Sequence, residues 1–219
     1  MPPNGTADEP KLRRRPISVS RAVSFAWSTF KKRYGLFSAV LLTIFAAWIG
    51  LEIAVIGGQR FGILLWTVAH LVFLLLFASV EIGFLQTCLR LYDGREPKTV
   101  DAFAHWWLGL KFLAGQILFL LVVAIGLLLL VVPGVYLGVR YALFGFCMAD
   151  TGADLTYSFR QSAILTAGTE IKLFGILAGL LLLNVLGASV LGLGLFITIP
   201  LSALVTTAIY RQLGSPRQA

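Results

Sequence analysis

Four ionisable side chains stand inside long apolar runs of this 219-residue sequence: Glu52, His70, Glu81 and Arg140. The stretch VVPGVYLGVRYALFGF (131–146) is typical, since Arg140 is its only charged residue. A charge within a hydrocarbon layer costs at least about 2.5–3.5 kcal/mol, so it normally faces protein or water and has a partner. Such residues line proton, ion or headgroup paths, or they fix the register of packed helices. Which chemistry applies depends on whether these runs cross a membrane.

The composition predicts an integral membrane protein. Hydrophobic residues make up 58% of the chain and charged residues 13%, whereas roughly a quarter of the residues of a soluble domain are charged. The mean hydropathy is +0.87. The apolar residues lie in blocks of about 20, the length at which a helix rising 1.5 Å per residue crosses a hydrocarbon core of about 30 Å.

The net charge of +8 comes from Lys and Arg residues that lie beside the apolar blocks. This placement indicates contact with membrane lipids, including anionic headgroups, and not with nucleic acid. The two cysteines, Cys88 and Cys147, lie within apolar segments, which favours buried thiols over a disulfide.

The pattern divides the chain into a tail and an all-α membrane domain. Residues 1–16 are rich in proline, end in a basic cluster and are expected to form a disordered cytoplasmic tail. Residues 17–219 form the membrane domain, which begins with an amphipathic interfacial helix over 18–33. We expect six transmembrane helices, at about 35–56, 61–91, 112–132, 135–149, 172–188 and 193–212.

Turn-forming residues and basic residues predict how these spans are connected. Pro133-Gly134 is expected to reverse the chain between the third and fourth spans, and Pro200 to kink the sixth. Lys and Arg cluster before the first span, after the sixth and in the two long connectors. This bias places both termini in the cytoplasm. Each of the three hairpins is preceded by a short amphipathic segment: SVSRAVSFAWSTF, TVDAFAHWWLGL or ADLTYSFRQSAIL.

The four intramembrane residues are expected to form one polar network. Glu81 and Arg140 lie at similar distances from Asp93 and Asp150, which mark the cytoplasmic ends of their spans. That spacing places both near the midplane with opposite charge, so we expect them to pair.

The rest of the network follows from helix geometry. Glu52 and His70 are expected to meet in the outer half of the bundle, and His70 shares a helix face with Glu81. Gln116 and Asn184 are further candidates. The network either locks helix packing or forms a path for a proton, ion or headgroup, and the sequence leaves both readings open.

Small residues predict where helices approach closely. Gly134 and Gly138, and likewise Gly175 and Gly179, are spaced four apart, which is typical of close helix packing. These faces suit a packed monomer or a homo-oligomer. No catalytic constellation is evident, nor are metal ligands at suitable spacing or a cofactor motif. The protein is therefore expected to be no enzyme.

The second half of the chain resembles a known bacterial family. The segments PGVYLGVRYALFGFCMAD, KLFGILAGLLLLNVLG and ITIPLSALVTTAIYRQL carry the resemblance: Pro-Gly followed by an aromatic residue, an Arg-aromatic pair, an acidic residue (Asp150) and Ile-Pro before the last helix. They resemble the membrane domain of some glycerophosphoryl diester phosphodiesterases and its stand-alone six-span relatives. The resemblance covers about 125–212 and implies a membrane fold in a bacterial cytoplasmic membrane. It implies no phosphodiesterase activity, because the sequence has no soluble barrel.

Two functions remain once catalysis and nucleic-acid binding are set aside. The first is a non-enzymatic membrane protein that moves or accommodates a small solute, ion or lipid within a helical bundle. The second is a structural or interaction subunit, whose amphipathic cytoplasmic helices shape the inner leaflet or dock a protein partner.

Overall fold

A computed structural model describes residues 17–57, 62–96, 106–189 and 192–214. The predicted tail, 1–16, lies outside the described residues. Within these ranges the chain folds into helices and no strand. The helices are α1 (Val19–Gly57), α2 (Gly62–Tyr92), α3 (Trp106–Leu129), α4 (Val131–Tyr141), α5 (Phe144–Thr151), α6 (Leu155–Thr166), α7 (Glu170–Ser189) and α8 (Leu195–Gln212).

The described residues include six helical stretches that are long and apolar enough to cross a membrane: α1, α2, α3, the α4–α5 stretch, α7 and α8. Many large apolar side chains on these helices are exposed, among them Leu128 (88%) and Val132 (79%). Such a surface is unfavourable in water but matches hydrocarbon. The chain is therefore a multi-pass membrane protein, as the composition predicts.

Helix α1 is kinked at the first predicted boundary. Two helical stretches meet at Arg33, whose φ of −122° and ψ of 23° are not helical, between the predicted interfacial helix (18–33) and the predicted first span (35–56). The N-terminal part of α1 buries Ala22, Ala26 and Phe30 in the core, while Val23 and Trp27 remain exposed. The predicted apolar face is thus divided, because one side of it packs against the rest of the protein.

The turn between α3 and α4 also differs from the prediction. Leu130, with φ −162° and ψ 141°, separates the two helices, so the chain reverses three residues before Pro133. Pro133 lies in the first turn of α4, where the missing N–H has no intrahelical partner to lose. Gly134 allows the helices to approach, since a Cβ there would lie 2.4 Å from the backbone nitrogen of Leu127.

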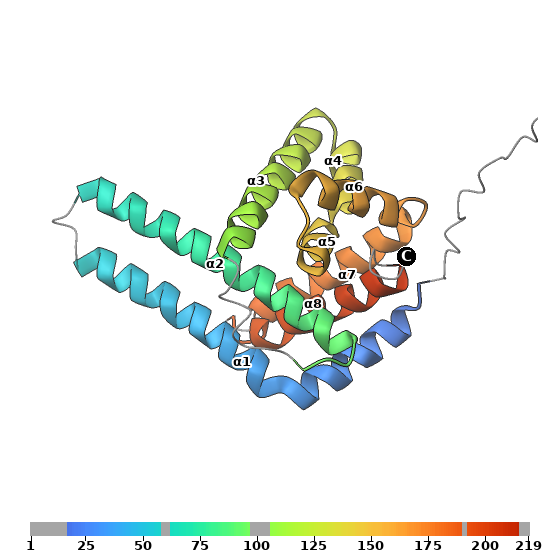
Figure 1. Ribbon diagram of the computed structural model, residues 1–219, viewed down its shortest axis with the longest axis horizontal. Coiled ribbons are helices and arrows are strands. Elements are labelled where there is room, and N and C mark those ends of the chain that lie inside the picture. The colour runs from blue at the N-terminus through green and yellow to red at the C-terminus, as the bar shows by residue number, and fades with distance from the viewer. Residues whose placement is uncertain (1–16, 58–61, 97–105, 190–191, 215–219) are drawn as a thin grey trace, which may run out of the picture.

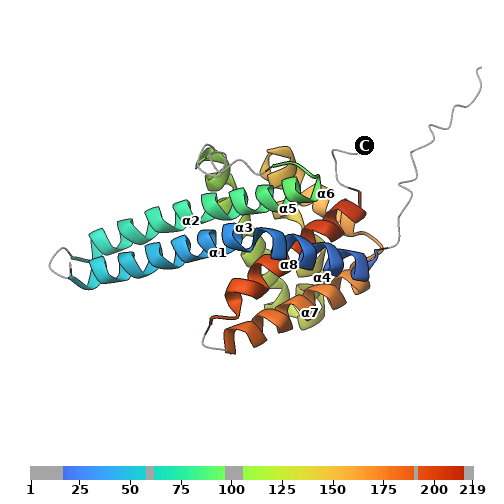
Figure 2. The same cartoon turned by 90° about the horizontal axis from the view of Figure 1, so that it is seen from below.

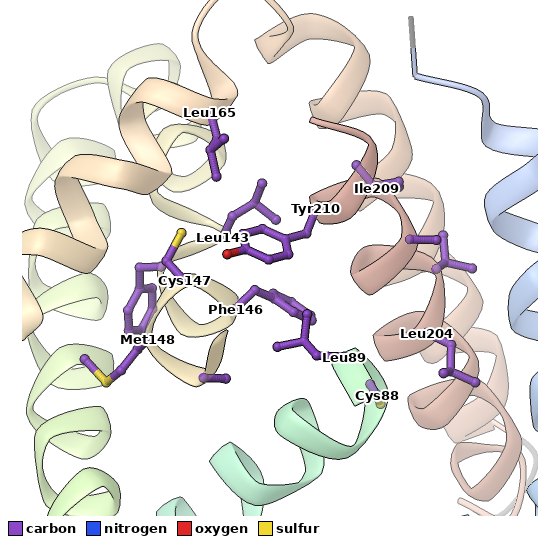
Figure 3. Packing of buried hydrophobic residues seen from close by; sticks show 14 of the residues in the cluster. Cys88, Leu89, Leu143, Phe146, Cys147, Met148, Leu165, Leu204, Ile209 and Tyr210 are labelled. Atoms are coloured by element: carbon purple, nitrogen blue, oxygen red, sulfur yellow. The ribbon is translucent and has the colours of Figure 1, made fainter. Parts of the chain in front are cut away.

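The helices spread outward from a shared core (Figures 1 and 2). The C-terminal half of α1 and the N-terminal half of α2 run alongside each other away from the other helices. α3 packs against both α2 and α4, and α8 packs against α1 and α7. The core lies where α1, α2, α5 and α8 meet. There Tyr210 of α8 reaches toward Phe146 and Cys147 of α5 (Figure 3), and its ring stacks on Phe146 with a centroid separation of 5.9 Å.

The two ends of the membrane domain lie together. The backbone N–H of Ser18 donates to Oε1 of Gln212 at 2.7 Å. Lys172 Nζ, at the start of α7, donates to the carbonyl of Ile17 at 2.7 Å. The beginning of α1 is therefore joined to both α7 and α8.

The predicted fourth span (135–149) is broken, and α6 stabilises the break. Helix α4 ends at Tyr141 and α5 starts at Phe144. The hydroxyl of Ser162 accepts from the Leu143 N–H at 3.2 Å and donates to the Arg140 carbonyl at 3.0 Å. Thr166 donates to the same carbonyl at 3.0 Å. Broken helices are tolerated at membrane depth where Ser and Thr side chains bond the freed backbone groups.

This arrangement predicts that Ser162→Ala lowers the free energy of unfolding by about 1–3 kcal/mol, because a buried N–H loses its acceptor. Denaturant unfolding in detergent micelles would measure the change. Ser28 is the matched control, since its exposed hydroxyl bonds only its own helix, at the carbonyl of Phe25. We expect Ser28→Ala to change stability by less than about 0.5 kcal/mol. Equal effects of the two substitutions would contradict the role given to Ser162.

Candidate functional site

The most deeply buried charge in the described residues belongs to what we call the Arg211 cluster: Asp93, Asp150, Tyr210 and Arg211. Arg211 Nη1 and Nη2 donate to the two carboxylate oxygens of Asp150 at 2.8 and 3.0 Å. Nη2 also donates to Asp93 Oδ2 at 2.7 Å, and the Tyr210 hydroxyl donates to Asp150 Oδ2 at 3.1 Å. The Arg211 and Asp150 side chains are 3% and 1% exposed. The cluster therefore joins the end of α2 to α5 and α8.

A meeting of Asp93, Asp150 and Arg211 is not among the sequence predictions. Asp93 and Asp150 mark the cytoplasmic ends of two predicted spans, and Arg211 lies at the end of the sixth. The opposite charges at one predicted membrane face are the signal that could have indicated the cluster. A pocket of about 250 Å³ adjoins the cluster and includes Arg90 and Gln86 among its lining residues. Since Arg211 already bonds both carboxylates, the cluster can hold three helices together without a ligand.

A second cavity, which we call the lateral groove, lies between α1, α2 and α8. Its volume is about 580 Å³. Its lining is apolar and strongly aromatic except for Glu81, the one ionisable residue in it. Residues from all three helices and from the turn before α8 line it: Val40, Leu41, Ile44, Phe45, Trp48, Phe73, Phe77, Glu81, Phe84, Leu85, Gly192, Leu193, Leu195, Phe196, Ile199 and Ala203.

Glu81 is held by one neighbour. Nε2 of Gln116, on α3, donates to its Oε2 at 2.7 Å, so Gln116 joins the polar network as the sequence suggests. Within the described parts of the chain, no Lys, Arg or His side chain lies within ion-pair distance of Glu81. An amide donor orients a carboxylate but brings no positive charge to balance it. Glu81 thus presents an oriented carboxylate to an apolar groove.

The expected Glu81–Arg140 pair is not formed. Arg140 bonds the hydroxyl of Tyr136, one turn earlier on α4, and its guanidinium carbon lies 5.6 Å from the centroid of that ring. Two features explain why the predicted pair is absent. The predicted depth of Arg140 in the membrane holds only for a continuous fourth span, whereas Arg140 lies in the last turn of α4, just before the break. In addition, α3 packs between α2 and α4, so it separates the two side chains.

Glu52 and His70 do meet, as expected, with Oε1 and Nε2 3.6 Å apart. His70 Nδ1 lies 2.9 Å from the carbonyl of Trp66, and since a carbonyl only accepts, Nδ1 carries the hydrogen. Nε2 therefore faces the carboxylate, and a proton on either group makes that contact favourable. Asn184 instead donates to Ser202 at 3.0 Å, so it joins α7 to α8 and lies apart from this pair.

The four predicted packing glycines differ in whether another helix lies close to them. A Cβ on Gly134 would collide with Leu127, and one on Gly138 would make ordinary contact with Val123, at 3.7 Å. These two glycines pack against α3. By contrast, a Cβ on Gly175 or Gly179 would meet nothing within 4 Å in the described chain. Gly175 and Gly179 thus face open space. Gly126, which is not among the predicted glycines, packs against α4, since a Cβ there would lie 2.7 Å from the Cα of Gly134.

Near the start of α3, Lys111 donates to Asp154, which precedes the first residue of α6 and lies outside the spans. This hydrogen bond, together with the positive charge of Lys111, holds the pKa of the exposed Asp154 carboxyl below its ordinary value. The contact ties α6, which stabilises the helix break, to α3.

Among the residues that the structure describes, no group of three or more His, Cys, Asp and Glu side chains could hold a metal ion. Cys88 and Cys147 are buried free thiols. His105, in the second amphipathic segment, lies outside the described residues.

Comparison of the chain with protein-family models, curated proteins and solved structures finds no match. The resemblance to the membrane domain of glycerophosphoryl diester phosphodiesterases therefore stays a prediction that rests on the sequence motifs.

The geometry of the Arg211 cluster predicts that Arg211→Leu lowers the free energy of unfolding by about 3–5 kcal/mol, because Asp150 is left buried without its cation. Thermal or denaturant unfolding in detergent would measure this loss. The double variant Asp150→Asn/Arg211→Leu is expected to recover much of it, since the buried negative charge is then removed.

Arg33 supplies the control for this experiment. It pairs with Glu96 at 2.8 Å, but these side chains are 41% and 81% exposed. Arg33→Ala should therefore cost no more than about 1 kcal/mol. If Arg211→Leu proves no more costly than Arg33→Ala, the cluster does not hold the helices together.

Proposed function

We propose that this protein is a non-enzymatic multi-pass membrane protein that accommodates a small, largely apolar molecule in the lateral groove. The observation that carries the proposal is the groove itself. Its volume of about 580 Å³ lies within the range of roughly 300–1,000 Å³ that small-molecule sites occupy. Its composition, apolar walls with one polar group, is also typical of such sites.

The position of the groove supports entry from the bilayer. All three of its walls belong to helices that are long and apolar enough to span a membrane. A molecule dissolved in the hydrocarbon would reach such a site without passing through water. The clustered aromatic side chains supply flat, polarizable surfaces for an apolar guest.

We further propose the membrane layout that the basic residues predict: three hairpins, both termini in the cytoplasm, and a bacterial cytoplasmic membrane. The contact between Ser18 and Gln212 supports placing both ends on one side. The Arg211 cluster, at the ends of α2, α5 and α8, would then lie near the cytoplasmic face. Anionic headgroups would contact the basic residues there.

The second candidate, a structural or interaction subunit, is favoured by the open face of α7. Gly175 and Gly179 lie there with no neighbour in the described chain, and Ile171 and Leu181 are exposed. A homo-oligomer or a protein partner could cover this face. We rank this role second because exposed apolar residues on such a helix also suit contact with lipid and do not by themselves indicate a partner.

Photolabelling tests the proposal. Full-length protein in liposomes would be irradiated with a small apolar aryl diazirine that partitions into the hydrocarbon, and the adducts mapped by mass spectrometry. We expect adducts to concentrate on groove residues such as Phe77 and Phe196. Leu181 and Leu182 of α7 are the internal control, since they are 66% and 61% exposed and would contact lipid without a groove.

The variant Ala203→Phe sharpens this test because it fills the groove from α8. It should reduce adducts on Phe77 and Phe196 and leave those on Leu181 and Leu182 unchanged. Uniform labelling of all four positions, with or without the substitution, would show that the groove is an ordinary lipid-facing surface.

A further inference from the structure

The contrast between Glu81 and the other buried or intramembrane acids indicates what the groove selects. Asp93 and Asp150 are paired with Arg211, and Glu52 faces His70. Glu81 has only the neutral amide of Gln116. A carboxylate in apolar surroundings is costly unless a positive charge balances it, and an acid without such a partner takes up a proton instead. The groove thus contains the one acid of these four that faces no basic side chain in the described residues.

Aromatic rings line the groove together with this carboxylate. Phe77 and Phe84 flank Glu81 at one-turn spacing on α2, and both line the groove with it. Four more aromatic side chains line the groove: Phe45, Trp48, Phe73 and Phe196. The faces of aromatic rings attract cations, by about 0.5–1 kcal/mol each at exposed sites and about 2 or more when desolvated. A carboxylate among several rings is therefore suited to a cation with an apolar body.

A neutral lipid tail fits this chemistry less well. It would fill the apolar volume but give the charged form of Glu81 no partner. An entirely apolar groove would hold such a tail better, since a buried acid, charged or neutral, reduces the stability of the protein unless polar groups satisfy it. Charge complementarity thus distinguishes between the two occupants.

We propose that the lateral groove binds a small lipophilic cation from the membrane, with Glu81 as its counter-charge. This inference rests on the proposed function, because it names the class of molecule that the groove accommodates. The apolar body of the ligand lies among the rings of α1, α2 and α8, and its positive charge lies at the Glu81 carboxylate.

Equilibrium binding of radiolabelled tetraphenylphosphonium to the full-length protein in nanodiscs of zwitterionic lipid tests the inference. Saturable binding to the wild type is expected, and Glu81→Gln should weaken it about tenfold or more, because the charge partner is lost while the shape is kept. Glu81→Asp should retain part of the affinity. Glu52→Gln is the matched control, since it removes another intramembrane acid that does not line the groove, and it should leave binding unchanged.

Triphenylmethane, a neutral probe of similar shape, separates this inference from the proposed function. If Glu81→Gln binds tetraphenylphosphonium as the wild type does, and both bind triphenylmethane, the groove accepts apolar molecules but the cation assignment is wrong. If neither probe binds saturably and the photolabelling by the aryl diazirine is uniform, the proposed function fails as well. If Glu52→Gln weakens binding as much as Glu81→Gln, the carboxylate of the groove is not the specific partner, and the inference is overturned.

Discussion

The need to balance charge in an apolar environment governs this structure. Arg211 meets that need most completely, because one guanidinium bonds Asp93 and Asp150 and so joins three helices at the core. Glu52 faces the imidazole of His70, a base that can carry a positive charge. Glu81 has only the neutral amide of Gln116 as a described partner, and that difference underlies the proposed ligand site.

The need to satisfy backbone polar groups shapes the fold in a similar way. A break at Ala142 and Leu143 would leave an N–H and a carbonyl without partners in an apolar layer. The hydroxyls of Ser162 and Thr166 bond them, which requires the polar helix α6 to pack against the break. Lys111 and Asp154 in turn hold the start of α6. A segment that reads as a separate amphipathic helix is thus a structural part of the helical domain.

Elements that depend on local pattern could be predicted from the sequence, whereas pairings between helices could not. The apolar runs place α2, α7 and α8 to within a few residues, because length and hydropathy determine a span. Glu52 and His70 follow from two spans joined by a short connection. The predicted Glu81–Arg140 pair is wrong because it depends on an unbroken fourth span and because α3 packs between α2 and α4. The local sequence pattern shows neither the break nor this packing. To predict the Arg211 cluster, one would need the arrangement of α2, α5 and α8 in space, and the hydrophobic periodicity of the sequence does not give that arrangement.

The paired charges of the Arg211 cluster and the carboxylate of Glu81 have different roles. The Arg211 cluster holds the helices at the core, while α1, α2 and α8 leave a groove at the carboxylate of Glu81. Crystals grown with tetraphenylarsonium would test this most directly, because arsenic scatters anomalously and marks the position of the cation. The account predicts one strong arsenic peak in the lateral groove, beside Glu81 and among the aromatic rings. A groove filled by continuous lipid density, with arsenic absent or bound elsewhere, would contradict it.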